Sequence, residues 1–210
     1  MSLSGLRVLA SMYRYPDSTY HARVVQAIDA LAQAGHEDAV APMEQFSQWV
    51  ASRSQSELEE GYTQTFDLSP KCSAEVGWHV FGEDYARGAF MVEIRQLLRE
   101  YEVPEDTELP DHISHMLLLI DAMATYAGRH GIADRATAEA ALRIIDDAIN
   151  LALEKMLEAL EKNASDFLPL MRATSSVLAD VRASIEPHEV VGASSSPTHH
   201  RNGHSEVAHD

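Results

Sequence analysis

The spacing of apolar residues constrains this chain more than any other feature. Apolar residues recur every three to four positions from near residue 3 to about residue 185, which is the spacing of one helix face. Leu58, Tyr62 and Phe66, for example, are four residues apart and form one stripe. No stretch shows the sustained alternation of apolar and polar residues that marks a half-buried strand. We therefore predict an all-α, single-domain helical bundle.

Prolines, glycines and capping residues divide this pattern into separate helices. The predicted helices cover residues 3–15, 17–35, a segment holding Phe46 and Trp49, and then 56–66, 83–102, 110–128, 134–160 and 165–185. In the helix over 83–102, the inward positions are expected to be Tyr85, Ala89, Phe90, Leu97 and Tyr101. From Pro187 the chain is rich in serine, histidine and proline. We expect a helical domain over residues 1–186 and a disordered tail over 187–210.

The charge balance and the apolar runs exclude several classes of protein. Sixteen basic and thirty-three acidic residues give a formal charge of -17, which disfavours binding to nucleic acid. The longest uninterrupted apolar run, 116–120, is far shorter than the ~20 residues of a membrane span. A single cysteine, Cys72, excludes a disulfide framework, and residues 1–15 do not resemble a secretory signal. These features favour the cytoplasm. A basic partner would be attracted, although many acidic proteins are simply soluble.

A run of acidic residues precedes Pro110. Its six members, with no basic residue among them, are Glu100, Glu102, Glu105, Asp106, Glu108 and Asp111. Such a run is usually a solvated turn. Pro110, however, suits the first position of a helix, which would place Asp111 and His112 in the first turn. The helix dipole there stabilises a carboxylate and disfavours a protonated imidazole. We expect both side chains to be reachable from solvent, with Asp111 free to bind an arginine directly.

Catalysis and metal binding are the alternatives to a binding protein. Asp111, His112 and His115 lie close enough in sequence to be considered for a metal-binding protein or a metal-dependent hydrolase. No His-Glu-x-x-His occurs, and Glu-x-x-His occurs only in the tail, at Glu206. There is no P-loop and no Gly-x-Ser-x-Gly, and no oxyanion hole is marked near Cys72. We therefore expect no enzyme, no cofactor and no metal.

The segment over 67–82 interrupts the helical pattern but contains large apolar side chains, including Trp78 and Phe81. A loop of this kind is either held against the core by these side chains or exposes them for binding. The sequence leaves both interpretations open.

Four short motifs resemble the TorD/DmsD/NarJ family of chaperones for molybdenum-containing enzymes. They are Tyr-Thr-Gln-Thr-Phe-Asp at 62–67, Glu-Val-Gly-Trp-His-Val-Phe-Gly-Glu at 75–83, Arg-Gly at 87–88 and Glu-Leu-Pro-Asp-His at 108–112. The resemblance extends over about residues 3–185, and the 66–67 and 78–82 segments are most similar to the branch that serves nitrate reductases and related dehydrogenases.

This resemblance implies a cytoplasmic binding protein with no catalytic activity. Its partner would be the catalytic subunit of a molybdenum oxidoreductase, bound through an N-terminal, twin-arginine-type leader until the molybdenum cofactor is inserted. Glu108, Pro110, Asp111 and His112 match the functional motif of the family. We add Tyr62, Phe66, Trp78 and Phe81 as residues that could line an apolar groove for the peptide. A plain helical scaffold or regulator is the third interpretation.

Overall fold

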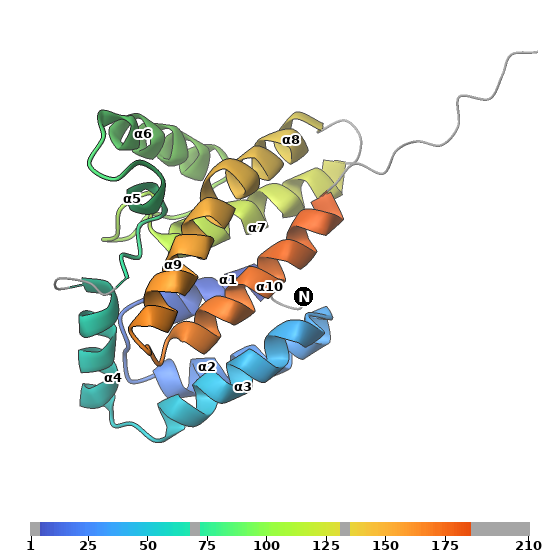
Figure 1. Ribbon diagram of the computed structural model, residues 1–210. Helices are drawn as coiled ribbons and strands as arrows, with labels where there is room; N and C mark the ends of the chain where they lie inside the picture. The colour runs from blue at the N-terminus through green and yellow to red at the C-terminus, as the bar shows by residue number, and fades with distance from the viewer. Residues whose placement is uncertain (1–4, 68–71, 131–134, 186–210) are drawn as a thin grey trace, which may run out of the picture.

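The computed structural model describes residues 5–67, 72–130 and 135–185, and these residues form a bundle of helices (Figure 1). In chain order the helical elements are α1 (Gly5–Ala10), the 3-10 turn η1 (Ser11–Tyr13), α2 (Tyr20–Ala34), α3 (Glu37–Ala51), α4 (Gln55–Tyr62), the π-helical turn η2 (Thr63–Asp67), α5 (Val76–Phe81), α6 (Tyr85–Glu100), α7 (Ile113–His130), α8 (Arg135–Ile144), the π-helical turn η4 (Ile145–Ile149), α9 (Asn150–Lys162) and α10 (Leu168–Ile185). The described residues contain no strand, so the all-α prediction is confirmed. The predicted tail, 187–210, lies outside the described residues.

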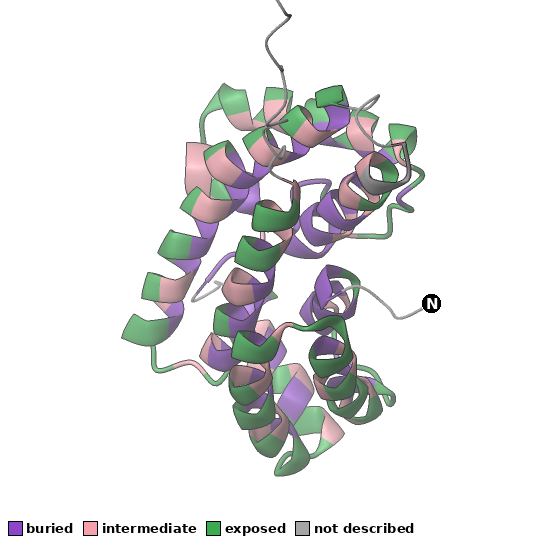
Figure 2. Ribbon diagram, turned by 90° about the vertical axis from the view of Figure 1, so that its right-hand side faces the viewer, coloured by how far each residue is buried: buried purple, intermediate pink, exposed green. Residues whose placement is uncertain are grey.

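The bundle is built from helices that pack in pairs. α2 and α3 form a hairpin whose turn is made by Gly35 in the left-handed conformation, at φ 85°. α10 packs along α3, α1 packs against α7, and α9 packs against α5. The helices α2, α3 and α9 each turn one face inward and leave the opposite face exposed (Figure 2). α7 differs, because none of its residues from 113 to 123 is exposed. None of the described helices is long and apolar enough to cross a membrane.

Aromatic side chains fill the part of the core between α3, α4 and the start of α10. The ring of Phe167 lies 5.5 Å from Phe46, 5.2 Å from Trp49 and 5.0 Å from Phe66, measured between centroids. Most of these pairs meet edge to face or tilted, which is the arrangement that aromatic rings favour. Leu58, Tyr62 and Phe66 are all buried, so the predicted stripe is confirmed. Its helix is capped by Ser54, through a capping box with Glu57.

The helix predicted over 134–160 contains a π-helical turn, η4, between α8 and α9. A π turn contains one extra residue, which rotates the helix that follows relative to the helix before it. Ile144 before the turn and Leu153 after it both face the core. Asp146 in the turn forms two bonds with Arg182 of α10, at 2.6 and 2.7 Å.

Two expectations for residues 76–90 are wrong. The apolar part of the predicted loop is a short helix, α5. In α6, Tyr85 is 99% exposed and Ala89 is exposed, although both were expected to face inward. α6 lies at the edge of the bundle and packs against α5 and α7 (Figure 1). Because only one side of this helix is covered, Tyr85 and Val92 stay in solvent.

Candidate functional site

A short backbone pairing joins the 108–112 motif to the segment that leads into α5. Glu75 lies opposite His112 in an isolated antiparallel bridge. The backbone N–H of Val76 donates to the carbonyl of Asp111 at 2.7 Å, and that of Ile113 donates to Ala74 at 2.8 Å. Because of this pairing α7 begins at Ile113, so Asp111 and His112 precede the helix and do not form its first turn.

Asp111 is fully buried and forms an ion pair with Arg87 of α6. Nε of Arg87 donates to Oδ2 at 2.9 Å, and Nη2 lies 3.5 Å from Oδ1. Because its side chain is fully buried, the expectation that Asp111 is reachable from solvent is wrong. The arginine that it binds belongs to the same chain. A two-point contact between a guanidinium and a buried carboxylate fixes the orientation of both groups.

Gly77 allows α5 to lie directly on this ion pair. A Cβ atom at position 77 would lie 2.6 Å from Oδ2 of Asp111 and 3.1 Å from Cδ1 of Phe90. No side chain larger than hydrogen fits there without displacing the carboxylate. The guanidinium of Arg87 also lies 5.8 Å from the centroid of the Trp78 ring, within cation–π distance. Trp78 itself is 40% exposed.

His112 is also buried, contrary to the expectation from sequence. Its Nδ1 accepts a bond from the backbone N–H of Ser114 at 3.2 Å and lies 2.7 Å from the hydroxyl of the same residue. Burial, together with the nearby His115, lowers the pKa of His112 to about 4. The imidazole is therefore neutral at physiological pH and serves as a hydrogen-bond acceptor that shapes the turn.

Four carboxylates gather beside this turn. They are Asp67, Glu75, Asp106 and Glu108, which we call the acidic patch. Burial, and then the negative charges of Asp106, Glu75 and Asp67, raise the pKa of Glu108. Asp106 is partly neutralised by Arg14, at 2.9 Å, and lies 3.1 Å from Nε2 of His115. Among the described residues Glu108 has no ion-pair partner, so a cation brought by a ligand would relieve its repulsion.

Tyrosines lie under and beside the acidic patch. Tyr62 is buried and donates a hydrogen bond to the carbonyl of Tyr13 at 2.8 Å. Burial, and then the negative charges of all four patch members, raise its pKa. The ring of Tyr15 meets that of Tyr62 edge to face at 5.5 Å and is 50% exposed. An exposed aromatic ring therefore borders a group of carboxylates.

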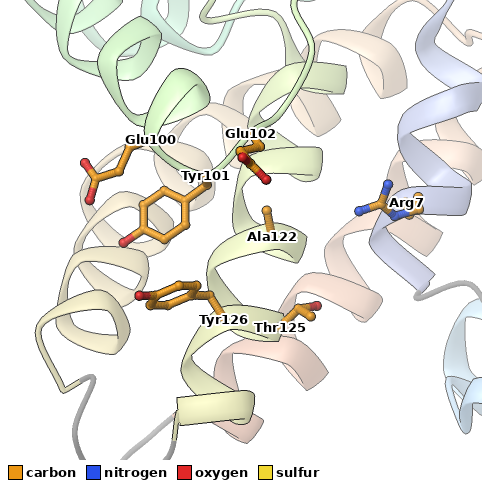
Figure 3. A pocket seen from close by; sticks show the side chains of 7 residues that line it. All are labelled: Arg7, Glu100, Tyr101, Glu102, Ala122, Thr125 and Tyr126. Carbon is orange, nitrogen blue, oxygen red and sulfur yellow. The ribbon is translucent and has the colours of Figure 1, made fainter.

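The structure divides the acidic segment over 100–111 into separate environments. Glu105 pairs with Arg95 of α6 at 2.7 Å. Glu100 and Glu102 lie at the other end of the segment and line a cavity of about 450 Å³ (Figure 3). Its remaining lining residues are Arg7, Tyr101, Ala122, Thr125 and Tyr126. The six acids therefore do not form one continuous surface, and only Asp106 and Glu108 belong to the acidic patch.

The alternatives based on a nucleophile or a metal gain no support from the geometry. Cys72 is buried, and burial followed by the charge of Glu75 raises the pKa of its thiol to about 12. Such a thiol remains protonated at neutral pH. Within the described residues, no group of three or more His, Cys, Asp or Glu side chains could hold a metal ion. Asp111 is bound to Arg87, and Nδ1 of His115 donates to the carbonyl of Leu109 at 2.9 Å.

The eight residues predicted as peptide contacts fall into groups with different exposure. Pro110, Asp111, His112, Tyr62 and Phe66 are buried, and Glu108, Trp78 and Phe81 reach the surface at least in part. Tyr62 and Phe66 therefore support the acidic patch from below, and they do not line an open groove.

Three residues that help to build this site, Arg87, Gly77 and Tyr15, are not among the eight predicted contacts. The first two lie within the quoted motifs, so their sequence context was a usable signal. Nothing in the sequence joins Tyr15 to Tyr62, because only the packing of η1 beside α4 brings their rings together.

Three comparisons with known proteins found similarities. The sequence profile of a family described as nitrate reductase delta subunit matches residues 29–162, a range that contains all eight predicted contacts. A Bacillus subtilis (strain 168) protein, described as a probable nitrate reductase molybdenum cofactor assembly chaperone, NarJ, is 27% identical over 184 residues, covering 85% of this chain and 91% of that protein. The crystal structure of an Archaeoglobus fulgidus protein, named as a redox enzyme maturation protein, is 18% identical, with a TM-score of 0.48, covering 87% of this chain and 92% of that one.

Proposed function

The chain belongs to the nitrate reductase delta subunit family, and from this premise we propose that it is a dedicated chaperone of a molybdoenzyme. In this proposal it binds the N-terminal leader of the catalytic subunit, of the twin-arginine type, and holds that subunit in the cytoplasm while the molybdenum cofactor is inserted. It acts by binding and has no turnover of its own.

The observation that carries this proposal is the acidic patch with an exposed aromatic ring at its border. A leader that combines arginines with an apolar run needs carboxylates for the guanidinium groups and aromatic surface for the apolar side chains. Glu108 and Asp67 supply the carboxylates, and Tyr15 supplies aromatic surface beside them. Trp78 adds apolar surface three residues after Glu75.

The electrostatics of Glu108 favour a cationic ligand. Its raised pKa means that the folded protein disfavours the charged carboxylate, first because the group is partly buried and then because neighbouring carboxylates repel it. A guanidinium placed among Glu108, Asp67 and Glu75 would remove that repulsion and form charge-assisted hydrogen bonds. The same residues would repel a negatively charged segment, which gives selectivity as well as affinity.

Calorimetry with a synthetic leader tests the proposal. The probe is the N-terminal segment of the molybdoenzyme catalytic subunit encoded beside this gene, and its control is the same peptide with each arginine replaced by glutamine. We expect binding of the first peptide and much weaker binding of the second. Glu108→Gln should weaken binding, whereas Glu44→Gln, an exposed position on α3, should not. Absence of binding to the unaltered leader would refute the proposal.

A further inference from the structure

Arg87 connects the buried Asp111 to the partly exposed Trp78. The carboxylate of Asp111 holds Nε of Arg87 at 2.9 Å, and the guanidinium then lies 5.8 Å from the centre of the Trp78 ring. Asp111 has no exposed surface, whereas Trp78 is 40% exposed. An arginine thus links a buried residue of the family motif to a partly exposed aromatic ring.

The backbone around Trp78 is fixed independently of its side chain. The N–H of Val76 bonds to Asp111, Nε2 of His79 lies 2.8 Å from the carbonyl of Ser73, and Nζ of Lys155 donates to the carbonyl of His79. The absence of a Cβ at Gly77 lets α5 approach the ion pair. With the backbone held, the main remaining freedom is rotation of the exposed Trp78 ring, and Arg87 is the charged group that lies against it.

We propose that Arg87 is a positioning residue for Trp78, and that Asp111 contributes to client binding through this arginine and not by contacting the leader. This inference rests on the proposed function. Asp111 fixes the plane of the guanidinium, which holds the indole ring in the orientation that the apolar part of the leader meets. Asp111 also neutralises Arg87, so that a positive charge next to the site does not repel a basic peptide.

Tryptophan fluorescence of the free protein tests the positioning step directly. The chain has two tryptophans, so Trp49→Phe leaves Trp78 as the only emitter. In this background Arg87→Lys keeps the positive charge but loses the planar, two-point contact. We expect faster ring motion in time-resolved anisotropy and greater quenching by acrylamide. Arg95→Lys, on the same helix but paired with Glu105, is the matched control and should change neither.

Leader binding tests the second step. Arg87→Lys should accelerate dissociation of the leader peptide roughly two- to fivefold, the scale of one cation–π contact, with little change in association. If Arg87→Lys does not fold, the double variant Arg87→Met with Asp111→Leu is used in its place. The double variant removes both charges, so no buried charge is left unpaired.

Unchanged anisotropy and quenching in a folded variant would overturn the inference, as would altered fluorescence with an unchanged dissociation rate. Failure of the parent protein to bind the leader refutes the proposed function instead, and the fluorescence of the free protein distinguishes the two results.

Discussion

Asp111 shows how the role of a single residue depends on its partner. Its carboxylate is buried and satisfied by Arg87, so removing it leaves a largely buried guanidinium without a counter-charge. Burial of an unpaired charge is among the most destabilising changes known in proteins.

We predict that Asp111→Ala lowers the free energy of unfolding by about 3 kcal/mol, the lower part of the range for breaking a buried pair, because Arg87 keeps 19% of its side chain exposed. Urea unfolding followed by circular dichroism measures this loss. The control is Asp146→Ala, which removes an ion pair with Arg182. The side chain of Arg182 is 34% exposed and that of Asp146 is 39% exposed, so this substitution should lower the free energy of unfolding by roughly 1 kcal/mol or less. Equal losses for the two variants would contradict the assignment of Asp111 to the core.

His112 predicts a dependence of stability on pH. Its pKa is about 4 in the folded protein and has its ordinary value of 6.5 when unfolded, so the unfolded chain binds more protons between these values. The contribution of the neutral His112 to the free energy of unfolding is therefore fully present above pH 6.5, and it is lost as the pH falls from there toward 4. Relative to His112→Asn, whose Oδ1 can replace the Nδ1 acceptor, the parent should lose about 2 kcal/mol more between roughly pH 7.5 and pH 5. Parallel pH profiles would show that the imidazole does not titrate as described.

At the scale of elements, the contact between α5 and the ion pair depends on a missing side chain. Gly77→Ala should destabilise the fold by about 1–3 kcal/mol, because its Cβ would meet the Asp111 carboxylate and the Phe90 ring. Gly88→Ala is the matched control, since a Cβ there meets nothing within 4 Å, and it should stabilise α6 by about 0.5–1 kcal/mol. Thermal unfolding of both variants measures the difference, and a neutral Gly77→Ala would show that α5 can move away from Asp111.

At the scale of the whole molecule, charge should govern encounter with the partner. The chain carries a net charge of -17, and exposed charges are screened over ~8 Å at physiological salt. The double variant Asp67→Asn with Glu108→Gln should slow association with a basic leader and flatten its dependence on salt. Stopped-flow association over a salt series measures both effects. An unchanged salt dependence in the double variant would show that the leader docks elsewhere.

Trp78→Ala should instead raise the dissociation rate, because it removes a large aromatic contact and leaves the patch charges in place.

Local pattern in the sequence determined the helices and most of the buried stripes. The stripe of Leu58, Tyr62 and Phe66 could be predicted because helical periodicity is a property of neighbouring residues. The same reasoning failed for Tyr85 and Ala89, because periodicity identifies an apolar face but not whether another helix covers it. The 108–112 motif was likewise recognisable in the sequence, although its exposure was not.

The tertiary structure alone decided which groups meet. Asp111 and Arg87 are 24 residues apart and pair only because α5 and α6 fold back over the 108–112 turn. Tyr15 reaches Tyr62, and Asp67 and Glu75 reach Glu108, through the same kind of long-range packing. The sequence by itself determined that the chain is helical, is acidic and carries a Pro-Asp-His motif. Burial and ion pairing depend on chain topology, which the local spacing of residues does not contain.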